Sequence, residues 1–88
     1  MIAELLHEGA DHPQTARDLS RLLGMDPRDI TRAIEAERKK GFLICATSRG
    51  YFLARDPQEA RQYARRLSRR IGSITQTRDA LAAAIGEG

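Results

Sequence analysis

The side chains best suited to specific recognition chemistry lie between residues 28 and 35. Arg28 is followed at helical spacing by Thr31 and Arg32, and these by Glu35, so a helix would carry all four on one surface. An arginine guanidinium can pair with the two acceptors on the guanine edge in a DNA major groove, and a glutamate can accept a hydrogen bond from cytosine. The spacing therefore predicts a helix face that could read base pairs.

Other polar residues stand where they could contact phosphate groups. Gln14, Thr15 and Arg17 lie at the start of another expected helix, where free backbone N–H groups favour anions. Such contacts would fix the register of a nucleic acid without reading its sequence. The residues expected to contact DNA are Thr15, Arg17, Arg28, Thr31, Arg32, Glu35, Arg38, Lys39 and Arg49.

The same charges have an alternative interpretation as a solvated helix surface. Acids and bases along residues 29–40 stand three or four residues apart and could neutralise one another. The candidate pairs are Asp29 with Arg32, Glu35 with Arg38 or Lys39, and Glu37 with Lys40. The acids would also repel phosphate, so both interpretations remain open at this point.

The element that must position this face is a helix beginning after Asp26. Asp26 can accept hydrogen bonds from the first turn, and Pro27 suits the first helical position because its missing N–H needs no partner there. Gly41 is a left-handed C-cap signal. The residues that recur at helical spacing on the face expected to meet the core are Ile30, Ala33, Ile34 and Glu37.

A β-hairpin is predicted directly after Gly41. Residues 42–47 and 51–54 are short runs rich in aromatic and branched side chains, and Ser48, Arg49 and Gly50 form the connection between them. Two strands are only marginally stable alone, so their apolar face must pack on the preceding helices. The charged tip would then point away from the core.

Two shorter helices are expected upstream. Residues 2–6 form a brief apolar stripe, residues 9–13 interrupt it, and Thr15 begins a second helix with Asp18 as its reciprocal cap. The residues of this helix expected to face the core are Ala16, Leu19, Leu22 and Leu23. Residues 24–26 then turn the chain into the next helix, which is the spacing of a helix-turn-helix.

In this order, the chain from Ile2 to Ala54 resembles the winged helix-turn-helix domains of bacterial regulators. The resemblance rests on TARDLSRLLGMD at 15–26, ITRAI at 30–34, KGFLI at 40–44 and RGYFL at 49–53. The N-terminal repressor domain of biotin protein ligases is similar, as are small DNA-binding proteins of phages and mobile elements. The resemblance implies a mainly α fold with a small hairpin over residues 1–55, with the 27–40 helix in a major groove and the wing on flanking backbone or minor groove. Nothing resembles the ligase domain, so biotin chemistry is not implied.

Residues 56–88 lie beyond the resemblance and are predicted to form one long amphipathic helix after Asp56 and Pro57. At about 1.5 Å per residue it would run roughly 40 Å, longer than a small domain can cover. We expect this helix to pair two chains as a homodimer, because a regulator that binds a two-fold symmetric DNA site needs two DNA-binding domains. The expected dimerisation residues are Tyr63, Leu67, Ile71, Ile74, Leu81 and Ile85. The alternatives are a helix lying back against Ile2, Leu5 and Leu6, a fold at Gly72, or fraying.

The same helix carries an arginine stripe, made of Arg61, Arg65, Arg66, Arg69 and Arg70. No acid stands three or four residues further along to neutralise these side chains, and like charges at that spacing are mildly unfavourable. Nucleic-acid phosphate, an acidic partner surface and a simply solvated face are all compatible with the stripe.

Charge and composition restrict the remaining possibilities. Residues 1–26 carry two arginines against five acids, residues 27–55 seven bases against three acids, and residues 56–88 six against four. The positive charge therefore lies where a nucleic-acid surface would require it. The 88 residues suffice for one domain with a small core, and the absence of an apolar membrane span or signal pattern indicates a cytoplasmic protein.

Catalysis and metal binding find little support. His7 and His12 are five residues apart, and with the single Cys45 they lack the ligand number and spacing of a zinc site. Cys45 in an apolar strand is more typical of a small core residue than of a reactive thiol. We expect no enzyme activity, no metal, no cofactor and no small-molecule ligand.

Two classes of function remain. The first is sequence-specific binding of double-stranded DNA by a small transcriptional regulator or mobile-element protein. The second is a protein-interaction module that docks on a replication or transcription assembly, for which the basic surface would be incidental.

Overall fold

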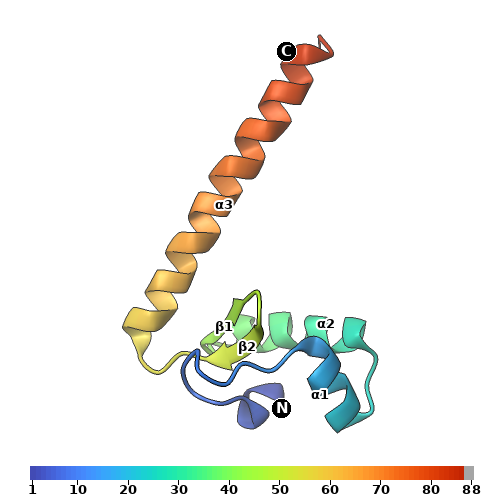
Figure 1. Ribbon diagram of the computed structural model, residues 1–88, viewed down its shortest axis with the longest axis vertical. Helices are drawn as coiled ribbons and strands as arrows, with labels where there is room; N and C mark the ends of the chain where they lie inside the picture. The colour runs from blue at the N-terminus through green and yellow to red at the C-terminus, as the bar shows by residue number, and fades with distance from the viewer. Residues whose placement is uncertain (87–88) are drawn as a thin grey trace.

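The computed structural model describes residues 1–86 and is mainly helical, with one two-stranded antiparallel hairpin in that range. The head, residues 1–55, contains the 3₁₀ turn η1 (Ile2–Leu5), helices α1 (Ala16–Leu23) and α2 (Pro27–Lys39), and strands β1 (Ile44–Thr47) and β2 (Gly50–Leu53). Helix α3 (Pro57–Ala84) leaves the head as a single rod (Figure 1). The predicted class, mainly α with a small hairpin and a long final helix, is confirmed.

Helices α1 and α2 begin where their capping residues predict. The Thr15 hydroxyl accepts a hydrogen bond from the Asp18 N–H at 3.0 Å, and the Thr15 N–H donates to the Asp18 carboxylate at 3.1 Å. The Asp26 carboxylate accepts from the Arg28 N–H at 2.8 Å, with Pro27 at the start of the helix. These bonds satisfy N–H groups that a helix start leaves without partners, which explains why both boundaries could be predicted.

The end of α2 shortens the first strand. The Phe42 N–H donates to the Glu37 carbonyl at 3.2 Å and the Gly41 N–H to the Arg38 carbonyl at 3.0 Å, and Gly41 has φ +101°, as the cap signal predicts. Because this cap occupies Phe42, β1 begins at Ile44. The predicted strand over 42–47 is therefore two residues too long, and Phe42 and Leu43 are exposed.

The hairpin turn is also tighter than predicted. Ile44 pairs with Leu53 and Thr47 with Gly50, so the tip is the two residues Ser48 and Arg49, and Gly50 belongs to β2. The other edge of β2 is covered by the segment at residues 7–14. There Gln14 and Tyr51 exchange backbone hydrogen bonds of 2.9 and 2.7 Å, and the Leu53 N–H donates to the His7 carbonyl at 2.9 Å. Strand β2 is consequently paired on both edges.

Gly50 is required by this close approach, and the Gly50→Ala variant tests it. A Cβ at Gly50 would lie 2.6 Å from the carbonyl carbon of Gln14 and 2.9 Å from the Thr15 nitrogen, at φ +135°. We expect the variant to lose about 1–3 kcal/mol of unfolding free energy in a urea titration. Gly72→Ala is the matched control, because no atom lies within 4 Å of its Cβ position inside α3. It should stabilise by about 0.5–1 kcal/mol; equal losses in both variants would contradict the assignment.

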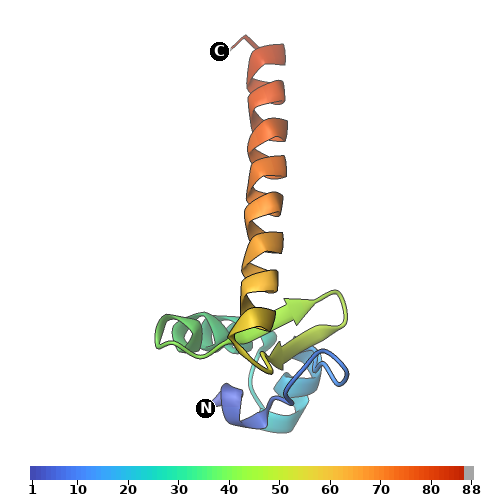
Figure 2. The same ribbon diagram turned by 90° about the vertical axis from the view of Figure 1, so that its left-hand side faces the viewer.

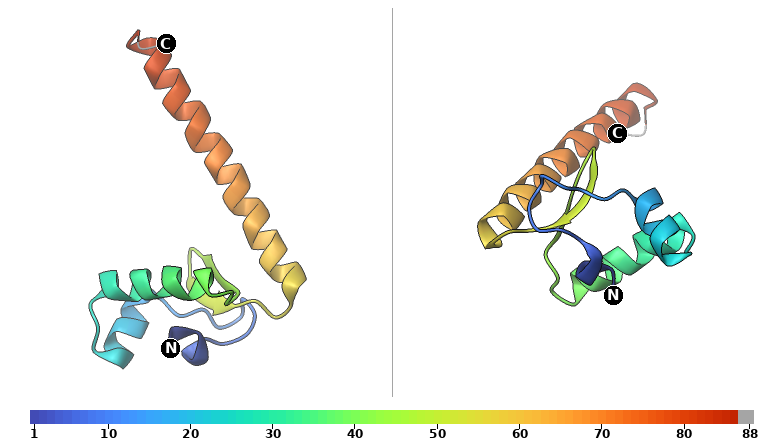
Figure 3. Two further views of the ribbon diagram at one scale, coloured as in Figure 1. Left: turned by 180° about the vertical axis from the view of Figure 1, so that it is seen from behind. Right: turned by 60° about the horizontal axis from the view of Figure 1, so that its bottom comes forward.

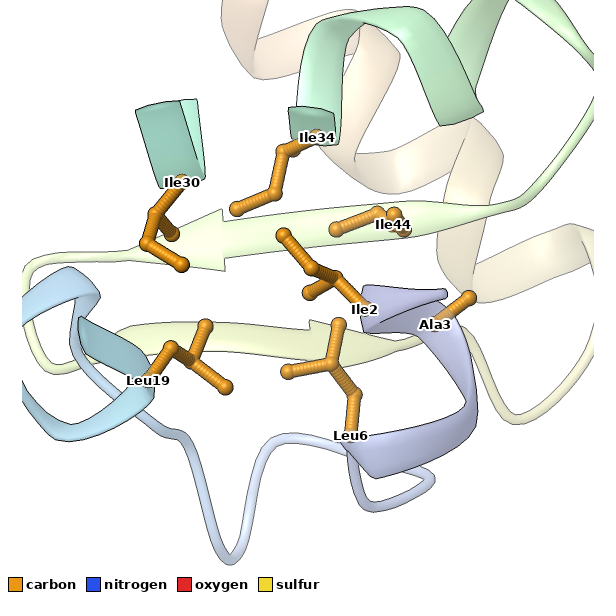
Figure 4. Packing of buried hydrophobic residues seen from close by; sticks show 7 residues of the cluster. All are labelled: Ile2, Ala3, Leu6, Leu19, Ile30, Ile34 and Ile44. Atoms are coloured by element: carbon orange, nitrogen blue, oxygen red, sulfur yellow. The ribbon is translucent and has the colours of Figure 1, made fainter. Parts of the chain in front are cut away.

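The core lies between η1, α1, α2 and β1 (Figure 4). Its buried members are Ile2, Ala3, Leu6, Leu19, Ile30, Ile34 and Ile44. The prediction that Leu22 and Leu23 face this core is wrong, because they are 62% and 39% exposed. Leu22 lies about 120° around the helix from Ala16, and Leu23 is the last residue of α1.

One acid occupies a core position of α2. Glu37 is 6% exposed, and its two carboxylate oxygens accept hydrogen bonds from the Ile2 N–H at 3.0 Å and the Ala3 N–H at 2.8 Å. The carboxylate thereby caps the first turn of η1, whose N–H groups have no partner within the turn. This contact explains why an acid recurs in the apolar stripe of α2.

The hairpin is covered on both faces. Ile44 and Leu53 pack with the core, whereas Cys45 and Phe52, which alternate with them, are buried outside that cluster. The first turns of α3 lie over this second face, where Phe52 lines a small hollow together with Glu59 and Tyr63. Burial raises the pKa of the Cys45 thiol, as expected for a small core residue.

Beyond these turns α3 extends away from the head (Figures 1 and 2). The radius of gyration is 16.0 Å, whereas about 12 Å is typical of a compact chain of this length. Ile71, Ile74, Leu81 and Ile85 are 60–68% exposed, and Gly72 lies inside the continuous helix. The alternatives of a helix lying back on Ile2, Leu5 and Leu6, or folding at Gly72, are therefore wrong.

Candidate nucleic-acid interface

The expected base-reading face of α2 is exposed. Arg28, Thr31, Arg32 and Glu35 all lie on the surface, opposite Ile30 and Ile34, which point into the core (Figure 4). The Thr31 hydroxyl donates to the Pro27 carbonyl at 3.2 Å and keeps its acceptor capacity. The helix thus presents guanidinium donors and hydroxyl and carboxylate acceptors on one surface.

Fewer of the positive charges on this face are neutralised by acids than the sequence alone suggests. Within residues 1–86, which the structure describes, Glu35 with Arg38 at 3.1 Å is the one predicted intrahelical pair that forms. Glu37 is committed to η1 and does not reach Lys40, and neither Arg28 nor Arg32 pairs with an acid in the described range. Lys39 is exposed and is likewise in no ion pair there. The exposed face of α2 therefore carries excess positive charge.

Arg38 has a different environment from the other expected DNA contacts. Its Nε donates to the Ile44 carbonyl at 2.9 Å and its Nη2 to the Tyr63 hydroxyl at 3.1 Å. The guanidinium also lies 6.0 Å from the Tyr51 ring centroid and 5.5 Å from that of Tyr63. Arg38 thus joins α2 to the hairpin and to α3, and most of its donors are occupied within the chain.

The start of α1 already contains an anion. The Asp18 carboxylate accepts from the Thr15 N–H, and this hydrogen bond holds the pKa of Asp18 below its ordinary value. A phosphate contact at Thr15 would therefore compete with Asp18, whereas Arg17 is exposed and in no ion pair within residues 1–86. Gln14 is tied to β2 through its backbone, and its side-chain oxygen is buried.

The hairpin tip carries an exposed arginine. Arg49 lies in the two-residue turn, and its backbone N–H donates to the Thr47 hydroxyl at 3.1 Å. The hairpin projects sideways from the base of α3 (Figure 2). Arg49 is consequently free to contact a molecule that approaches the head.

The structure also forms a groove that sequence reasoning did not find. Hairpin residues Ala46, Thr47 and Ser48 form one wall, and Tyr63, Arg66, Leu67 and Arg70 of α3 form the other. Arg66 and Arg70 were recognised only as part of a stripe, because the angle at which α3 meets the hairpin is not encoded locally. The regular spacing of Tyr63 with the other expected dimerisation residues was the available signal that this face of α3 meets another surface.

The expected dimerisation residues fall into two groups. Tyr63 is partly buried against Arg38 and the groove, and Leu67 is 38% exposed beside the hairpin, so both contact their own head. Ile71, Ile74, Leu81 and Ile85 lie beyond the head, and no other element of residues 1–86 covers them. These four residues form what we call the distal stripe.

Residues 1–86 contain no group of three or more His, Cys, Asp or Glu side chains arranged to hold a metal ion. The His7 and His12 rings meet edge to face at 6.0 Å, in an exposed loop. Among the described helices, none combines the length and apolar character needed to cross a bilayer.

Comparison with protein-family models, curated proteins and solved structures finds no match to this chain.

Proposed function

We propose that this chain is a winged helix-turn-helix protein that binds double-stranded DNA. In this proposal α2 enters the major groove, and the β1–β2 hairpin is the wing on the flanking backbone. The order of elements supports it, because η1, α1, α2 and the hairpin follow one another with a three-residue connection, 24–26, between α1 and α2. In this proposal the chain is a small transcriptional regulator or mobile-element protein of the cytoplasm.

The observation that carries the proposal is the unpaired positive charge on α2. Of the three acids in residues 27–55, Glu37 is buried in the core, Glu35 is paired with Arg38, and Asp29 alone is exposed and in no ion pair within residues 1–86. Arg28 and Arg32 on the exposed face, with Arg49 at the wing tip, therefore dominate the local field. Such a field attracts phosphate, and the arginines have the donor geometry to read guanine.

Duplex binding and the Arg32→Ala variant test the proposal. Fluorescence anisotropy should detect binding of random-sequence duplex at low salt, with affinity that falls steeply as ionic strength rises. On a duplex selected from a random pool, Arg28→Ala and Arg32→Ala should each weaken binding by about 1–3 kcal/mol, roughly 5- to 150-fold in Kd.

Arg21→Ala is the matched control for this test. Arg21 lies in the last turn of α1, at the end of the head remote from α3 (Figure 1). Its removal takes away the same charge but no proposed contact, so the affinity should stay within a few-fold of the wild type. Absence of duplex binding at low salt, or equal losses in Arg21→Ala and Arg32→Ala, would contradict the proposal.

The distal stripe supports a homodimer as the assembled form. Residues 71–84 contain one base and one acid, Arg78 and Asp79, which pair at 2.9 Å, so this half of α3 is neutral. A second copy would meet a matching apolar stripe there without charge repulsion. The proximal half, which carries the arginine stripe, would repel its own copy, so the pairing surface is distal.

A protein-interaction role remains the second candidate, and exposed apolar side chains of the head favour it. Leu22 is 62% exposed and Leu43 is 46% exposed. Large apolar side chains at such positions can serve as contacts for a partner in a replication or transcription assembly. A chain that binds no duplex at low salt would support this role.

A further inference from the structure

The groove between the wing and α3 combines features that suit an anion. It has a volume of about 420 Å³, and its walls are Ala46, Thr47 and Ser48 on one side and Tyr63, Arg66, Leu67 and Arg70 on the other. The lining includes two guanidinium groups and three hydroxyls but no acid. A phosphate group accepts hydrogen bonds from both kinds of donor.

The charges of the two arginines in the groove are unpaired within the part of the chain that the structure describes. No ion pair joins Arg66 or Arg70 to an acid among residues 1–86. Glu59, two turns before Arg66 on α3, accepts a hydrogen bond from the Arg55 N–H at 2.8 Å. Two like charges one helical turn apart are unfavourable unless an anion lies between them.

The orientation of these arginines is fixed by contacts deeper in the head. The Tyr63 hydroxyl accepts from Arg38, which is itself bonded to the Ile44 carbonyl. At about 100° per residue, Arg66 and Arg70 lie within about 60° of Tyr63 around α3, whereas Arg65 and Arg69 lie about 120–160° from Tyr63. Because the contacts of Tyr63 fix the rotation of α3, Arg66 and Arg70 face the wing. Arg65 and Arg69 face away from it.

The position of the groove relative to α2 adds to the argument. Helix α3 rises from the head on the side away from η1 and α1 (Figures 1 and 3). The exposed face of α2 is turned away from the same two elements, because Ile30 and Ile34 point toward them (Figure 4). A duplex on α2 would consequently run beside the first turns of α3.

We propose that this groove binds a phosphate of the nucleic-acid backbone, so that Arg66 and Arg70 act with the wing as a second clamp on DNA. The inference rests on the proposed function, since the phosphate belongs to the duplex held by α2. It assigns a role to two of the five arginines of the stripe and leaves Arg61, Arg65 and Arg69 as solvated charges.

Two double variants, both on α3, test the clamp. Arg66→Gln with Arg70→Gln removes the groove pair, and Arg65→Gln with Arg69→Gln removes an equally spaced pair that is rotated by about 100° around α3, outside the groove. In a salt titration of duplex affinity, the groove variant should lower the magnitude of the slope of log K against log salt by about 0.9, the value for one phosphate contact. That change corresponds to roughly 8-fold weaker binding at 0.1 M salt. The variant at Arg65 and Arg69 should change affinity less than about threefold.

The outcomes separate the clamp from the proposed function. Equal losses in both double variants would overturn the clamp, because only the overall field would then matter. An unchanged salt slope in the groove variant, with binding still weakened by Arg32→Ala, would overturn the clamp and leave DNA binding by α2 standing. No duplex binding by the wild type would overturn both, and an acidic protein surface would then be the better occupant. Circular dichroism should give matching melting curves for the two double variants, since all four side chains are exposed.

Discussion

Replacing Glu37 by alanine is expected to remove about 4 kcal/mol of unfolding free energy, the largest stability effect of any substitution considered. The change leaves the N–H groups of Ile2 and Ala3 buried without acceptors, since their hydrogen bonds to the carboxylate are 3.0 and 2.8 Å long. Each unsatisfied buried N–H costs about 1–3 kcal/mol. A domain of this size has roughly 4–13 kcal/mol in total, so urea unfolding should show a much lower midpoint.

Two further variants distinguish the hydrogen bonds of Glu37 from its packing. Glu37→Gln keeps the shape of the side chain, but its amide nitrogen would face an N–H donor, so only one of the two bonds can be kept. It should fall between the wild type and Glu37→Ala. Glu35→Gln is the control on the same helix, because Glu35 is exposed and bonded only to Arg38. Its cost should stay near 0.5 kcal/mol, and a Glu37→Ala loss no larger than this would contradict the capping role.

The boundaries of the helices were predictable because their signals are local. Each of these helices begins at a capping side chain that accepts a hydrogen bond from a backbone N–H within three residues. The capping residues are Thr15, with Asp18, Asp26, with Pro27 after it, and Asp56. Neighbouring residues are therefore enough to specify the helix boundaries. The recurrence of Glu37 in the apolar stripe was also visible. Its partners were not, because the N–H groups it accepts lie 34 and 35 residues away in the chain.

The candidate interface was predictable only in part, because it depends on how the elements meet. The exposure of Arg28 and Arg32 follows from helical periodicity, as does the burial of Ile30 and Ile34. The internal engagement of Arg38 does not, since it depends on Tyr63, 25 residues further along. The groove formed by Arg66 and Arg70 likewise depends on where α3 crosses the hairpin.

The unpaired end of α3 leads to the second large effect, which concerns assembly. The wild-type chain is expected to be a dimer in light scattering at micromolar concentration, because the distal stripe exposes Ile71, Ile74, Leu81 and Ile85 on a neutral half-helix. Full burial of one such side chain is worth about 1.5–3 kcal/mol. Eight of them across two copies could offset the cost of association, which is about 4–15 kcal/mol.

Ile74→Asp should convert this dimer to a monomer. The substitution acts twice in a two-fold assembly, so it should cost about 3 kcal/mol or more, over 100-fold in the dimer dissociation constant. Gln76→Asp adds the same charge to the same part of α3, but at about 200° from Ile74 around the helix, on the opposite face. It should leave the dimer intact. A monomeric wild type, or equal disruption by both aspartates, would rule out pairing through the distal stripe. The two heads would then have to act on DNA as independent units, with the shallower dependence on protein concentration that single-site binding gives.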